Sequence, residues 1–353
     1  MKKLVALLFS LLFCSPIFAA QFKEIVFLGD SLSDSGNLYN IIKIVPKSPP
    51  YYHGRFTNGP TWAELVGKHF NDSSSTTFVN YCYGGATSIL HNIFYDSFIA
   101  PITLTGEVYS YLLGTLFTDK SNTLYAIWIG ANDYLYDRHP DLDALTNDVV
   151  ANIEWAMNTL RSQGATQFLI MNLPDLSRTP LAKDENLVDR LHTISLIHNK
   201  KLSEMVKKIQ SEHSDIHITF VDVFNIFNDL LDNTEKFNQQ HHTEFNNLTQ
   251  ACWTGGVFLK NNPVLNINSV NADLQKAFAN TKLAKEKNFN TLAMSKFIVN
   301  SPSLAEAYST TKLAEAGGQA CENTNQYVFF DHLHPTAAVH VVFADIVVKN
   351  LEA

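Results

Sequence analysis

The 353-residue sequence predicts an α/β fold in which helices cover both faces of a parallel sheet, giving three layers. Five short apolar runs alternate with longer segments whose apolar residues recur with a helical period. A content of 46% hydrophobic and 17% charged residues is typical of a globular protein with a sizeable core. Ligands of such sheets bind at the carboxyl ends of the strands, so functional residues are expected there.

Each predicted strand is an apolar run bounded by turn residues, and the first run stops at Gly29. The predicted strands cover residues 24–28, 78–83, 123–129, 167–172 and 216–223. The main predicted helices cover residues 60–70, 143–163, 182–212 and 335–351.

A large insertion is predicted before the C-terminal helix. From residue 224 to about 326 the apolar pattern weakens, Asn, Gln and Lys become frequent, and one helix is predicted at 274–289. Two clusters rich in Tyr and Phe, at 91–98 and 107–117, are expected to line a pocket or form a lid. The whole of residues 21–353 is predicted to be a single domain.

Residues 1–20 indicate a secretory signal peptide, because two lysines precede an apolar run that ends in small residues. A lipoprotein signal would use Cys14, but the bulky Phe13 precedes it. The apolar run is shorter than the roughly 20 residues that cross a bilayer, and no later segment qualifies. We therefore expect a secreted protein, periplasmic or extracellular, with no transmembrane segment.

The charge balance of the chain argues against nucleic acid as a partner. Twenty-six basic residues against 34 acidic ones leave a net charge of −8, which disfavours nucleic acid as a partner. Aromatic residues make up 12% of the chain, which hints at an apolar surface for a greasy ligand.

Three cysteines follow the predicted signal peptide, and an oxidising compartment favours a disulfide. Cys82 lies in an apolar segment, as a buried strand thiol would. Cys252 and Cys321 flank a polar, lysine-rich segment. We predict a Cys252–Cys321 disulfide that closes the insertion at about 252–321.

A candidate nucleophile follows the first strand in the segment G-D-S-L-S-D-S-G-N, residues 29–37. Ser31 stands there on a tight turn between a strand and a helix, where its hydroxyl and backbone N–H can face an electrophile. An ordinary turn with a capping Ser or Asp has the same appearance.

A candidate base stands near the other end of the chain, in D-H-L-H-P-T. The spacing of Asp331 and His334 lets the carboxylate accept from one imidazole nitrogen while the other faces outward and can deprotonate a serine. Asp30 lacks this spacing and is interpreted as structural. A capped helix start and a metal site are alternatives, but no H-E-x-x-H or paired C-x-x-C motif supports a metal.

Two further turns supply hydrogen-bond donors for an oxyanion: Gly84-Gly85 after the second strand and Gly130-Ala131-Asn132-Asp133 after the third. A backbone N–H at a glycine and an Asn amide suit a tetrahedral intermediate. Each is a common turn sequence by itself. All four signals nevertheless fall at loops that a parallel sheet places at one edge.

The order of these motifs resembles the GDSL, or SGNH, hydrolase family. The longer forms G-D-S-L-S-D-S-G-N, G-R-F-T-N-G-P at 54–60 and D-x-x-H-P-T resemble its secreted bacterial lipase branch, which contains lysophospholipases, phospholipases A and glycerophospholipid:cholesterol acyltransferases. The resemblance covers most of the chain and implies an SGNH-hydrolase-like, flavodoxin-type sheet. No G-x-S-x-G elbow is present, which argues against the common α/β-hydrolase fold.

The resemblance implies roles for individual residues. Ser31 would be the nucleophile, His334 the general base and acid, and Asp331 the residue that orients His334. The oxyanion donors would be the Ser31 N–H, the Gly85 N–H and the Asn132 amide. Gly85 is preferred to its neighbour because the family glycine follows a small residue. No metal or cofactor is implied.

The leading hypothesis is a secreted serine esterase that cleaves fatty-acyl esters of phospholipids or lysophospholipids through an acyl-enzyme, with transient contact to a membrane or micelle surface. Acyl transfer to a sterol acceptor is an alternative that differs only in what intercepts the acyl-enzyme. A carbohydrate deacetylase is a third hypothesis. A non-catalytic binding module on the same fold is the alternative from another class.

Overall fold

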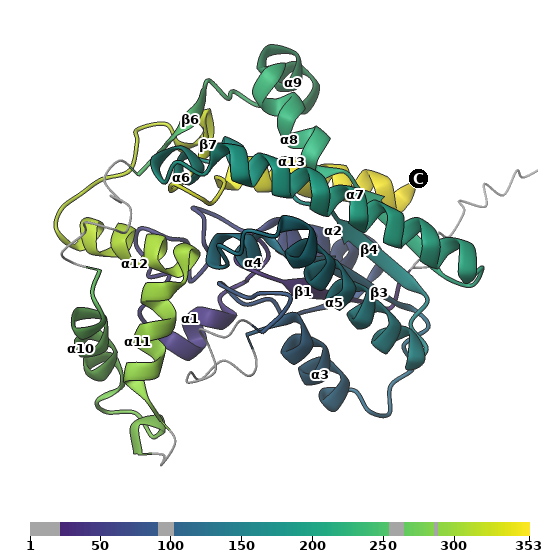
Figure 1. Ribbon diagram of the computed structural model, residues 1–353, viewed down its shortest axis with the longest axis horizontal. Coiled ribbons are helices and arrows are strands. Elements are labelled where there is room, and N and C mark those ends of the chain that lie inside the picture. Colours follow the sequence, from purple (N-terminus) through teal and green to yellow (C-terminus); the bar gives the residue numbers. More distant parts are fainter. Residues whose placement is uncertain (1–21, 91–101, 254–264, 286–288) are drawn as a thin grey trace, which may run out of the picture.

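The computed structural model describes residues 22–90, 102–253, 265–285 and 289–353 (Figure 1). Its centre is a five-stranded parallel sheet in the order β2-β1-β3-β4-β5. The strands are β1 (Glu24–Gly29), β2 (Thr77–Asn80), β3 (Thr123–Trp128), β4 (Gln167–Met171) and β5 (His217–Val221). This strand order is the flavodoxin-like one, so the predicted fold class is confirmed. The predicted signal peptide, residues 1–20, lies outside the described residues.

Helices pack on both faces of the sheet, which makes three layers (Figure 1). Because side chains alternate along a strand, Tyr125 and Ile127 of β3 belong to one core cluster and Leu124 and Trp128 to the other. The helices of the first cluster include α3 (Leu104–Gly114), α5 (Leu142–Ser162) and α7 (Val188–Glu212). The helices of the second include α2 (Trp62–Ser74), α8 (Val223–Asp232) and α13 (Ala337–Glu352).

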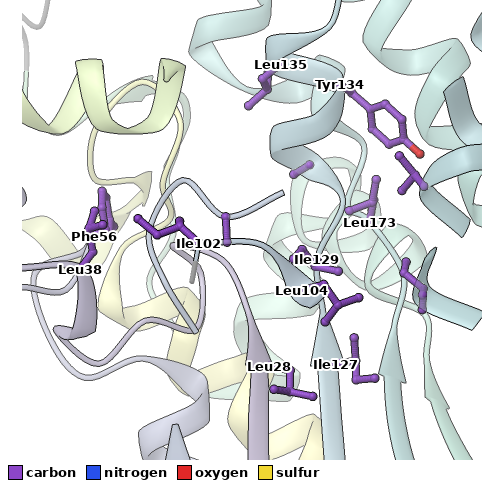
Figure 2. Packing of buried hydrophobic residues seen from close by; sticks show 14 of the residues in the cluster. Leu28, Leu38, Phe56, Ile102, Leu104, Ile127, Ile129, Tyr134, Leu135 and Leu173 are labelled. Atoms are coloured by element: carbon purple, nitrogen blue, oxygen red, sulfur yellow. The ribbon is translucent and has the colours of Figure 1, made fainter. Parts of the chain in front are cut away.

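The first core cluster extends from the sheet to the loops at its carboxyl edge (Figure 2). Leu28 of β1 and Ile127 of β3 are register partners. Farther along, Leu38 and Phe56 pack against Gly84 in the loop that follows β2. A Cβ at Gly84 would lie 2.1 Å from the Phe56 ring, so this position requires glycine. Tight packing therefore supports the loop edge where the candidate site residues lie.

The predicted helices at 60–70, 143–163 and 335–351 correspond to α2, α5 and α13. The helix predicted at 182–212 is divided into α6 (Pro180–Asp184) and α7. Asn186 lies in the break with φ 54°, a left-handed conformation that a continuing helix does not allow.

The insertion differs from the prediction. The helix expected at 274–289 is wrong in both bounds, because α10 begins at Ile267, where Asn266 caps it, and ends at Phe278. The segment also contains α9 (Thr234–His241), α11 (Thr291–Asn300), α12 (Pro302–Glu315) and β6 (Asn247–Ala251), which pairs with β7 (Tyr327–Phe329). Helix α12 was not predicted, because its buried positions include small polar residues: Ser303, Ser309, Thr310 and Thr311. Such positions leave no apolar period in the sequence.

The predicted disulfide is confirmed, since Cys252 and Cys321 are bonded across a sequence separation of 69. Cys252 follows β6, and the backbone N–H of Cys321 donates to its carbonyl at 3.0 Å. Cys82 is a buried free thiol, as predicted, but it lies two residues beyond the end of β2 and not within the strand. Among the helices in the described ranges, none combines the length and the apolar character that crossing a bilayer requires.

Candidate active site

Ser31 lies in the turn that joins β1 to α1 (Asn37–Ile42). The Asp30 carbonyl accepts the N–H groups of Ser33 and Asp34, both at 3.0 Å. The Asp34 carboxylate accepts from the N–H groups of Gly36 and Asn37 at 2.7 and 2.6 Å. These bonds fix the turn and leave the Ser31 side chain on the wall of a cavity. The supporting role of Asp34 was not predicted.

The structure brings Ser31, His334 and Asp331 together although 303 residues separate the serine from the histidine. The Oγ of Ser31 lies 3.0 Å from Nε2 of His334. The Nδ1 of His334 lies 2.8 Å from Oδ2 of Asp331 and 3.1 Å from Oδ1. One imidazole nitrogen thus faces the carboxylate and the other faces the hydroxyl, as the spacing of Asp331 and His334 predicted.

The Asp331 carboxylate is fully buried but well supplied with donors. Its Oδ1 accepts from the N–H groups of Leu333 and His334 at 2.8 and 2.7 Å, and its Oδ2 accepts from the Tyr51 hydroxyl at 2.6 Å. Burial opposes ionisation, yet the charge of His334 and these hydrogen bonds hold the pKa of Asp331 below its usual value. Tyr51 was not predicted, because nothing near it in the sequence marks it.

The candidate oxyanion donors Gly85 and Asn132 lie shortly after β2 and β3. Gly85 has φ 76°, a left-handed conformation that favours glycine. The N–H of Gly84 donates to Asp34 at 2.8 Å, which leaves Gly85 as the better candidate of the pair. Asn132 stands in α4 (Ala131–Tyr136) and lines the same cavity as Ser31.

Asp30 is buried beside the nucleophile but does not pair with the imidazole, since Nδ1 of His334 faces Asp331. Its Oδ1 accepts from the N–H of Leu32 at 3.0 Å. Burial raises the pKa of Asp30 to about 7, against the opposing effects of that hydrogen bond and of the charge of His334. Asp30 is therefore a further titratable group at the site, beside Asp331 and His334.

A cavity adjoins Ser31, Asn132 and His334. Apolar side chains supply most of its wall, and they come from both the sheet and the flanking helices: Trp128, Leu135, Leu176, Phe227, Phe329, Leu333 and Phe343. The aromatic cluster predicted at 107–117 falls largely in α3, which lies elsewhere. The cluster at 91–98 lies outside the described residues.

Within the part of the chain that the structure describes, no three His, Cys, Asp or Glu residues are placed to hold a metal ion. The site is instead built from a hydroxyl, an imidazole and a carboxylate in sequence, next to amide donors. This arrangement suits nucleophilic attack on an ester carbonyl.

A parallel three-layer fold with such a site defines an enzyme of the ester hydrolase and acyltransferase class. The family profile described as GDSL-like Lipase/Acylhydrolase matches residues 25–347. The chain belongs to this family, as its motifs predicted.

Three of the relatives are bacterial proteins. The phosphatidylcholine-sterol acyltransferase of Aeromonas hydrophila is 29% identical over 94% of this chain and 91% of its own length. The thermolabile hemolysin of Vibrio parahaemolyticus is 26% identical over 94% of this chain and 64% of its own length. The secreted effector protein SseJ of Salmonella typhimurium is 30% identical over 58% of this chain and 48% of its own length.

Proposed function

We propose that this enzyme is a secreted esterase that hydrolyses fatty-acyl esters of phospholipids and lysophospholipids through an acyl-enzyme on Ser31. The observation that carries the proposal is the largely apolar cavity beside a serine hydroxyl that is hydrogen-bonded to His334. An apolar cavity at the nucleophile favours an acyl chain over a sugar, which disfavours the carbohydrate deacetylase alternative.

In the first half of the reaction, the Ser31 Oγ attacks the ester carbonyl carbon while Nε2 of His334 takes the hydroxyl proton. The Asp331 carboxylate orients the imidazole and stabilises its protonated form. The carbonyl oxygen gains negative charge, and the N–H groups of Ser31 and Gly85 and the Asn132 amide would bind it. Collapse of the intermediate releases the alcohol, which receives the proton from His334, and leaves the acyl group on Ser31.

In the second half, His334 deprotonates a water molecule that attacks the acyl-enzyme, and the fatty acid is released with Ser31 regenerated. A sterol hydroxyl that replaced the water would give acyl transfer. This second candidate is supported by the acyltransferase of Aeromonas hydrophila, which matches 94% of the chain. No cofactor takes part in either route.

Two observations support secretion. The Cys252–Cys321 disulfide is of the kind that persists in oxidising compartments. Residues 1–20 have the pattern of a signal peptide. Lipid substrates aggregate, so the enzyme would contact a membrane or micelle surface transiently during turnover.

The test is incubation of the enzyme with defined diacyl lipids, lysolipids and short acyl esters, with and without cholesterol, followed by product analysis. We expect free fatty acid from lipid substrates, whereas cholesteryl ester as the main product would favour the acyltransferase. Failure to cleave any acyl ester would contradict both.

Fluorophosphonate labelling tests the nucleophile separately. Wild type should be labelled at Ser31, while Ser31→Ala should be neither labelled nor active. Ser35→Ala is the matched control, because Ser35 belongs to the same loop but does not line the cavity. An unlabelled, folded wild type would indicate the non-catalytic binding module.

A further inference from the structure

The Asn132 amide is held at both of its ends. Its Nδ2 donates to the Ala86 carbonyl at 2.9 Å, and its Oδ1 accepts from the Ser303 hydroxyl at 3.1 Å. The side chains of Asn132 and Ser303 are both buried. Since an amide nitrogen carries two hydrogens, one of them remains for a bound oxyanion. The direction of that hydrogen depends on the two partners that hold the amide plane.

Ser303 belongs to the first turn of α12, inside the disulfide-closed insertion. The Ser301 side chain caps this helix by accepting from the N–H of Leu304 at 3.4 Å, and its Oγ lies 3.2 Å from that of Ser303. Gly85 lies against the same turn, since a Cβ there would be 3.1 Å from the Ser301 Oγ. The start of α12 therefore contacts both segments that carry these candidate oxyanion donors, the loop after β2 and helix α4.

Helix α12 also contacts the turn that carries Asp331 and His334. Glu306 follows Ser303 by three residues, so both lie on one face of the helix. The Glu306 Oε1 lies 2.7 Å from Nδ1 of His332 and accepts the N–H of the same residue at 3.1 Å. Glu306 is itself buried. One helical face thus links the two halves of the site.

We propose that Ser303 is a positioning residue that holds the Asn132 amide in its oxyanion-binding orientation. The inference rests on the proposed role of Asn132. A donor is effective only when it is fixed before the charge develops, because reorientation during the reaction would cost part of the stabilisation. The disulfide-closed insertion thereby supports the catalytic centre through α12.

The first test compares Ser303→Ala with Ser309→Ala. Ser309 lies in the same helix and is also buried, but its hydroxyl has no hydrogen-bond partner among the described residues. Ser303→Ala should lower kcat about five- to tenfold with little change in KM, because one hydrogen bond that acts in the transition state is lost. Ser309→Ala should retain the wild-type kcat. Equal kcat values for the two variants would overturn the inference.

The second test is a double-mutant cycle with Asn132→Ala. We expect Ser303→Ala to have no further effect on kcat once the amide is absent. Independent, multiplying effects would overturn the inference and leave the proposed function intact. An unchanged kcat in Asn132→Ala itself would remove the oxyanion assignment and the inference with it.

Melting curves show whether the variants are folded. If Ser303→Ala is too unstable to assay, Ser303→Cys is the second variant, because a thiol is similar in shape and only a weak donor. Its kcat should fall below that of wild type with KM retained. A wild-type kcat in folded Ser303→Cys would contradict the inference in that case.

Discussion

The Tyr51 hydroxyl donates a hydrogen bond of 2.6 Å to Oδ2 of Asp331, across 280 residues of sequence. The same carboxylate oxygen lies 2.8 Å from Nδ1 of His334. Tyr51 also packs edge-on against Phe330 with ring centroids 5.4 Å apart, so its ring is positioned independently of its hydroxyl. The carboxylate is thereby held between a tyrosine and the imidazole.

Tyr51→Phe removes this donor and retains the ring. We expect kcat to fall roughly ten- to a hundredfold, since a hydrogen bond to a charged group contributes about 1.5–3 kcal/mol. The hydrogen bond from Tyr51 also helps to hold the pKa of Asp331 below its usual value, so its loss raises that pKa. The acid limb of the pH profile of kcat/KM should therefore move to higher pH.

The measurement for Tyr51→Phe is a set of pH profiles with a soluble ester. Tyr111→Phe is the control, since Tyr111 is a buried tyrosine whose hydroxyl pairs with that of Tyr125 and not with the site. An acid limb that is identical in wild type and Tyr51→Phe would show that Tyr51 supports packing alone.

The cavity beside Ser31 predicts a dependence on acyl-chain length. Leu176→Phe places a larger side chain in the wall and should exclude part of a long chain. Each methylene that loses its buried position costs about 0.8 kcal/mol, so the loss of two lowers kcat/KM about tenfold for long-chain esters. Short-chain esters should be cleaved at nearly the wild-type rate, and they serve as the internal control. Equal losses for long and short esters would argue against an acyl-chain cavity.

The Cys252–Cys321 disulfide should stabilise the protein and support the site at once. Replacing both cysteines by serine is expected to lower the free energy of unfolding by about 4 kcal/mol in the chain-entropy model. Because α12 contacts the site from within this loop, hydrolysis of long-chain and short-chain esters should decline in parallel. Cys82→Ser controls for the loss of a thiol. A selective change in lipid hydrolysis would instead indicate that the loop acts as a lid.

Asp30 should affect how stability varies with pH. The unfolded carboxyl loses its proton near its usual pKa of 3.8, while burial, opposed by the Leu32 N–H and the charge of His334, raises the folded pKa to about 7. Between these values the folded state binds more protons, so the contribution of Asp30 to stability declines as pH rises and is lost above about pH 7.

Asp30→Asn keeps an acceptor for the Leu32 N–H and removes the titration. Denaturant unfolding between pH 4 and 8 should show a smaller decline in stability in the variant than in wild type. Parallel curves for the two proteins would contradict the raised pKa.

Much of the fold can be predicted from local sequence patterns. Each of the five parallel strands is a short apolar run, and this pattern needs no knowledge of distant contacts. The candidate residues Ser31, Gly85 and Asn132 follow strands directly, so a parallel sheet alone brings their loops to one edge. The spacing of Asp331 and His334 likewise marks them as a pair.

The remaining features depend on contacts between residues far apart in the chain. Tyr51 and Ser303 reach Asp331 and Asn132 through single hydrogen bonds that no local pattern encodes. Helix α12 buries small polar side chains, so its sequence does not indicate which of its faces packs against the rest of the protein. The sequence by itself determined the sheet, the family and the residues proposed for chemistry, because strand periodicity and motif spacing are local. The tertiary structure decided which side chains hold those residues in position, because that depends on the approach of separate segments to within hydrogen-bonding distance.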